Sequence, residues 1–61
     1  SYGAYFESLK KYNEYLTETI TLANKVKTGI SQNDLNDEMT KLDALMKESD
    51  TLAIKSDQTR P

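Results

Sequence analysis

The stretch KTGISQND, which runs from Lys27 to Asp34, interrupts the helical pattern of this chain and decides its fold. Gly29 suits the positive-φ position that commonly follows the last turn of a helix. Ser31 is placed to cap a second helix with its side-chain oxygen, and Asp34 adds negative charge near the positive end of that helix. These signals predict a turn over residues 29–31 that separates two helices.

The segment before the turn predicts an amphipathic helix over about residues 3–28. Its apolar and aromatic residues recur at spacings of three and four, the a and d positions of a heptad repeat. The a and d positions hold Tyr2, Tyr5, Leu9, Tyr12, Leu16, Thr19, Ala23, Val26 and Ile30. The charged residues of this segment all lie on other heptad positions, so we expect this stripe to face the second helix.

The segment after the turn predicts a second helix over about residues 32–56. Leu35 follows the cap at the position that makes a hydrophobic staple with Ile30. The same spacing of three and four then holds Leu35, Met39, Leu42, Met46, Ser49, Ala53 and Ser56. Residues 57–61 offer no apolar side chain, so we expect a frayed tail there.

The fold class that follows is all-α, with residues 1–61 forming a single antiparallel two-helix hairpin that resembles a coiled coil. Residues whose numbers add to about 61 are then expected to face each other. This pairing places Tyr12 opposite Ser49, a large residue against a small one. With 61 residues and neither Cys nor His, the chain has no disulfide and no usual zinc site to supplement a small core, so we expect association to complete a bundle.

One flank of the expected hairpin carries an additional apolar strip. The strip consists of Tyr15, Leu22, Leu45 and Leu52. We expect these residues to bind a partner, which is either a second copy in a homodimer or higher oligomer, or another helical protein. The alternative is that wide packing inside the hairpin already covers most of the strip.

The opposite flank carries an acidic row of Asp43, Asp50 and Asp57, spaced seven residues apart. Such a row is most often a solvated face, but it also suggests a second function, a small regulator or inhibitor that presents the row to a basic partner. Neighbouring members lie about 10 Å apart along a helix, too far to share one metal ion. Asp34 to Glu38 also fails as a calcium loop, because the glycine and glutamate that such a loop requires are absent.

Composition and pattern argue against several other functions. The absence of His and Cys removes the usual general base and thiol nucleophile, so we expect no enzyme, no catalytic residues, no cofactor and no metal. A net charge of −2 gives no general attraction to nucleic acid, and no segment has the pattern of a membrane span or a signal peptide. Cytoplasmic and secreted locations both remain open. The expected shape, though no motif, is similar to that of type III secretion needle subunits and their small helical co-chaperones, and we expect an assembly subunit, adaptor or small chaperone.

Overall fold

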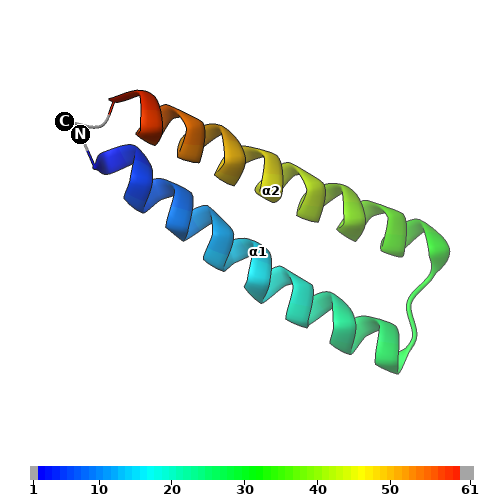
Figure 1. Cartoon of the computed structure of the whole chain (residues 1–61). Coiled ribbons are helices and arrows are strands. Elements are labelled where there is room, and N and C mark those ends of the chain that lie inside the picture. Colours follow the sequence, from blue (N-terminus) through cyan, green and yellow to red (C-terminus); the bar gives the residue numbers. More distant parts are fainter. Residues whose placement is uncertain (1, 60–61) are drawn as a thin grey trace.

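The computed structural model describes residues 2–59 and consists of two long helices. Helix α1 spans Gly3–Thr28 and helix α2 spans Gln32–Thr59. Figure 1 shows them running antiparallel, with the turn at one end and the start of α1 beside the end of α2 at the other. The Cα atoms extend 48 × 16 × 10 Å, so the hairpin is a long, narrow slab. The expected all-α helical hairpin is confirmed.

The turn forms at Gly29. Its φ of 110° lies in the range that favours glycine, and its N–H donates a hydrogen bond of 2.9 Å to the Lys25 carbonyl oxygen. The positive φ is therefore as expected, but ψ is 126°, outside the left-handed helical region. The chain thus leaves α1 in an extended conformation and reaches α2 within three residues.

Helix α2 begins with the expected serine cap. The Asp34 N–H donates to Ser31 Oγ at 3.1 Å, and the Leu35 N–H donates to the Ser31 carbonyl oxygen at 2.9 Å. Ile30 and Leu35 are both half-buried, as the two residues of a hydrophobic staple should be. Helix α1 has no matching cap, because Tyr2 at its start makes no side-chain capping bond.

The helix bounds agree with expectation except at the end of α2. Helix α1 occupies residues 3–28, whereas α2 continues to Thr59, three residues past its expected end. No glycine or proline interrupts residues 57–59, so nothing in the backbone stops the helix there. The rest of the expected tail, residues 60 and 61, lies outside the described residues.

The helices meet along a line of small and polar as well as apolar residues. The buried and half-buried positions on α1 include Ala4, Ser8, Lys11, Tyr15, Glu18 and Leu22, and those on α2 include Leu35, Glu38, Leu42, Leu45, Ser49, Leu52 and Ser56. Ser8 and Ser49 are the most buried, at 8% and 6% exposure. Ser8 Oγ donates to the Ser49 carbonyl oxygen at 3.1 Å, and Ser49 Oγ donates to the Ser8 carbonyl oxygen at 3.2 Å. Each short side chain reaches the other backbone, so the two helices come close together here.

The expected seam on α1 is therefore wrong. The stripe that includes Tyr5, Leu9, Tyr12 and Leu16 lies exposed, and Ser49 pairs with Ser8 instead of Tyr12. Close approach of the backbones at the serine pair leaves no room for tyrosine or leucine side chains directly between the helices. Helix α1 is accordingly rotated so that the expected stripe lies to one side of the contact.

Candidate protein-binding face

The exposed stripe on α1 lies about a quarter turn from the helix–helix contact. Each member of this stripe follows a contact residue by one position, as Tyr12 follows Lys11 and Leu16 follows Tyr15. One residue corresponds to about 100° of rotation around an α-helix. The apolar side chains thus emerge from one broad side of the hairpin.

Helix α2 adds apolar residues to the same side. Met39, Met46 and Ala53 each follow a contact residue by one position. Because the helices are antiparallel, a quarter turn in the same sense brings both stripes to one side of the pair. Tyr5, Ser8, Ala53 and Ser56 line a common groove at the open end, in agreement with this placement. We call this side the apolar face, and it comprises Tyr5, Tyr12, Leu16, Ala23, Met39, Met46 and Ala53.

The hairpin leaves this face uncovered. Tyr12 and Leu16 are 44% and 41% exposed, and no hydrophobic residue of the described chain is buried. A small protein normally hides at least part of its apolar residues completely. Contact between two helices alone therefore leaves much of this chain's apolar surface in water.

Aromatic contacts give part of the apolar face a fixed shape. The Tyr12 and Tyr15 rings stack with centroids 6.2 Å apart and an interplanar angle of 16°, while Tyr5 and Phe6 meet edge to face at 5.6 Å. Tyr15 is half-buried in the helix–helix contact, so stacking against it orients Tyr12. Such contacts limit rotamer freedom before any partner arrives, which lowers the entropy cost of binding.

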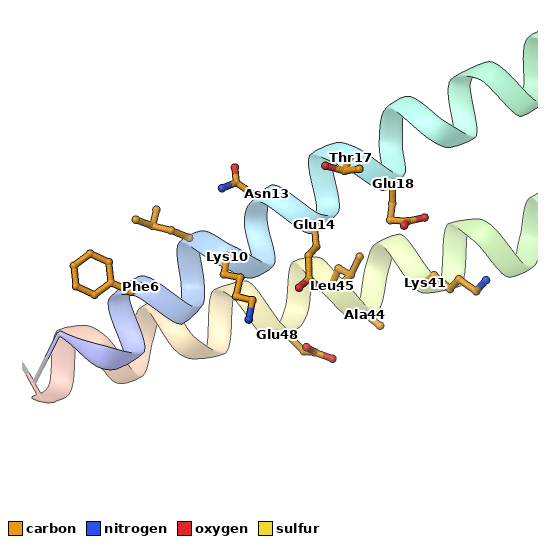
Figure 2. A pocket seen from close by; sticks show the side chains of 11 residues that line it. Phe6, Lys10, Asn13, Glu14, Thr17, Glu18, Lys41, Ala44, Leu45 and Glu48 are labelled. Atoms are coloured by element: carbon orange, nitrogen blue, oxygen red, sulfur yellow. The ribbon is translucent and has the colours of Figure 1, made fainter.

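The opposite broad side, which we call the charged face, is covered by its own ion pairs. Lys11 lies 3.6 Å from Glu14 and 3.2 Å from Glu48, so this cluster joins the two helices. A second cluster places Lys25 and Lys41 at 3.3 and 3.4 Å from Glu38. Figure 2 shows Glu14 and Lys10 reaching from α1 toward α2, with Glu48 and Lys41 on α2. Each cluster thus joins opposite charges across the helix pair.

These ion pairs shift the pKa values of their members. The hydrogen bond from Lys25 holds the pKa of Glu38 below its ordinary value, against an opposing effect of desolvation. The hydrogen bond to Glu48, helped by the nearby Glu14 carboxylate, raises the pKa of Lys11. Both pKa shifts favour the charged forms of Lys11 and Glu38.

A shallow groove lies on the charged face. Its lining mixes charged, polar and apolar residues of both helices, including Phe6, Leu9, Lys10, Lys41 and Glu48 (Figure 2). Among residues 2–59 no group of three or more acidic, histidine or cysteine side chains could hold a metal ion. Within the same part of the chain, every buried side-chain nitrogen and oxygen has a hydrogen-bond partner. The groove is an open depression between the two helices.

The residues expected to bind a partner lie elsewhere. Tyr15, Leu22, Leu45 and Leu52 are half-buried in the helix–helix contact, where the two helices cover much of their surface. Their role in binding a partner stays a prediction, and several residues expected to form the hairpin's own core, such as Tyr5, Tyr12 and Leu16, are exposed instead. The small size of Ser8 and Ser49 is the sequence signal that could have identified the contact.

The acidic row borders the apolar face. Asp43, Asp50 and Asp57 are all exposed, and each lies one residue beyond a contact position of α2. Asp57 helps to line the groove that holds Tyr5 and Ala53, which places the row at the margin of that face. Lys47 Nζ approaches Asp43 Oδ2 to 2.8 Å, and this hydrogen bond raises the pKa of Lys47. The row therefore places carboxylates along one rim of the apolar face, and that of Asp43 is paired with Lys47.

Comparisons with known proteins add no assignment. A scan against protein-family models and searches of curated proteins and of solved structures found no match to the chain. Within the described residues, neither helix combines the length and apolar character needed to cross a membrane.

Proposed function

We propose that this chain is a non-enzymatic interaction module that docks on a helical protein surface through its apolar face. One observation carries the proposal: Tyr5, Tyr12, Leu16 and Met39 lie exposed on one side of the hairpin, while no hydrophobic residue among those described is buried. A surface helix of a self-sufficient domain would turn this stripe inward. The arrangement suits an assembly subunit, an adaptor or a small chaperone.

The energy available from covering this face is large for so small a chain. Burial of a leucine or methionine side chain contributes roughly 2 kcal/mol. Leu16 and Met39 are 41% and 56% exposed, so covering what remains open on these two side chains would add about 2 kcal/mol. Whole domains have net stabilities of about 5–15 kcal/mol, so this gain is a substantial part of the stability of a small hairpin.

The acidic row supports a second candidate, a regulator that binds a basic partner. The row is exposed along the rim of the apolar face, so a basic ligand could contact both features. Binding through carboxylates weakens as salt rises, whereas apolar docking does not. The salt dependence of binding therefore separates the two candidates.

Photo-cross-linking in the cells that produce the chain tests the docking face. A photoreactive amino acid replaces either Tyr12 on the apolar face or Thr21, an exposed residue of the same helix that the apolar face does not include. We expect discrete covalent adducts from position 12 and none from position 21. Equal yields at both positions, or no adduct at position 12, would contradict the proposal.

A further inference from the structure

We infer that the partner on the apolar face is a second copy of this chain, packed as a two-fold dimer with both turns at the same end and each α1 lying over α2 of the other copy. This inference rests on the proposed docking function and names the occupant of that face. The result is a four-helix bundle in which every pair of neighbouring helices is antiparallel.

The dimensions of the face suit such a dimer. The broad side of the hairpin is 48 Å long and 16 Å wide between Cα atoms. A flat rectangle of these dimensions measures roughly 800 Å², which is comparable with the accessible surface that one partner contributes to a standard-size stable interface. One further hairpin covers this side completely.

The positions of the apolar residues along the long axis of the hairpin, which we call their heights, give the face a complementary shape. Inside the hairpin Ser8 lies level with Ser49, Lys11 with Glu48, and Lys25 with Glu38. By the same register Met46 lies level with the gap between Tyr12 and Leu16, while Ala53 is near Tyr5 and Met39 is near Ala23. Large residues therefore lie level with small residues or with gaps.

A two-fold axis parallel to the helices preserves these heights. Rotation about it places α2 of the partner subunit over α1 with the same register as inside the hairpin. Met46 of the partner subunit then enters between Tyr12 and Leu16, and the partner's Ala53 meets Tyr5. This is the knob-and-hole packing that neighbouring helices of a bundle require.

The acidic row disfavours the other two-fold arrangement. An axis perpendicular to the helices would place α2 over α2 in opposite directions, with two rows of Asp43, Asp50 and Asp57 along one margin. Like charges brought together oppose such pairing. In the parallel arrangement each row instead borders α1 of the other copy, whose facing residues include the uncharged Tyr12 and Leu16.

Single cysteines test the geometry, because the natural chain contains none. The purified full chain carrying Ala53→Cys or Ala23→Cys is treated with a short bis-maleimide cross-linker. The control is Thr51→Cys, an exposed position of α2 outside the apolar face. We expect either apolar-face variant alone to give at least about tenfold more covalent dimer than the control, because association raises the effective concentration of the second thiol.

The other outcomes each overturn the inference in a recognisable way. Cross-linking only in a mixture of the two apolar-face variants would show the opposite relative direction of the hairpins. No excess over Thr51→Cys, together with sedimentation as a monomer, would exclude a second copy. If such a monomer forms a photo-adduct at position 12 with another protein, the second copy is excluded but the proposed docking function stands. An adduct with lipid alone contradicts both the dimer and the docking function. Neither covalent dimer nor photo-adduct would likewise contradict both.

Discussion

The two broad sides of this hairpin are made by the same two helices but differ in how far the chain satisfies them. On the charged face, Lys11 and Glu38 each bind two side chains of opposite charge, including one across the helix pair. On the apolar face, Tyr12 and Leu16 remain open to water. The comparison teaches that a face without internal partners is the part of a small helical protein to examine for function.

The difference between the two faces depends on the helix–helix contact. Among the substitutions below, Leu45→Asp should destabilise this contact most. This half-buried leucine lies between the helices, so an aspartate there would place a charge in an apolar contact. We expect a loss of about 3 kcal/mol or more in the free energy of unfolding. Urea unfolding followed by circular dichroism measures it, with Ala44→Asp at the adjacent exposed position as control. Equal midpoints for the two variants would show that Leu45 does not lie in the contact.

The rotation of α1 that separates the two faces depends on the serine pair. We expect Ser8→Leu to destabilise the hairpin by about 1–3 kcal/mol, because the larger side chain forces the helices apart. Ser8→Ala keeps the close approach and should cost about 1 kcal/mol for the lost hydrogen bond. Chemical denaturation of both variants at one protein concentration provides the comparison. A leucine variant as stable as the alanine variant would contradict the observed rotation.

The turn fixes the relative height of residues on both faces, and its cap gives a smaller effect. Ser31→Ala removes the oxygen that accepts from the Asp34 N–H, so we expect a loss of about 1 kcal/mol. Tyr2→Asp provides the converse test at the uncapped start of α1, where a new cap should raise stability by a few tenths to about 1 kcal/mol. Thermal unfolding measures both changes, and a destabilised Tyr2→Asp would argue that Tyr2 contributes by packing.

The smallest expected effect is the loss of stability at acid pH through an ion pair of the charged face. The folded hairpin lowers the pKa of Glu38, chiefly through the hydrogen bond from Lys25. Glu38 therefore contributes stability at pH above its ordinary value of 4.5, and this contribution is lost as the pH falls through the lowered folded value. Glu38→Gln should flatten this part of the profile of unfolding midpoint against pH, and Glu7→Gln serves as control. Identical acid profiles for Glu38→Gln and the natural chain would contradict the role of this ion pair.

Local signals in the sequence predicted the fold, but not which face each helix turns toward the other. Gly29 and Ser31 determine the turn through their own backbone and capping chemistry, so neighbouring residues suffice to place it. Apolar periodicity located a stripe on α1, but the structure leaves much of that stripe exposed instead of packing it against α2. Periodicity shows that a stripe requires cover, and it does not distinguish cover by the same chain from cover by another. Close approach at Ser8 and Ser49 depends on residues far apart in sequence, so it emerged only from the structure.

Sedimentation equilibrium over a wide concentration range, in low and high salt, tests directly whether the apolar face joins two copies of the chain. The samples are the natural chain, Leu16→Asp on the apolar face, and Thr17→Asp at the next position, which lines the groove of the charged face. We expect a dimer for the natural chain and for Thr17→Asp at both salt concentrations, and a monomer for Leu16→Asp. If the natural chain and Leu16→Asp sediment alike at every concentration, the apolar face is not the interface between copies.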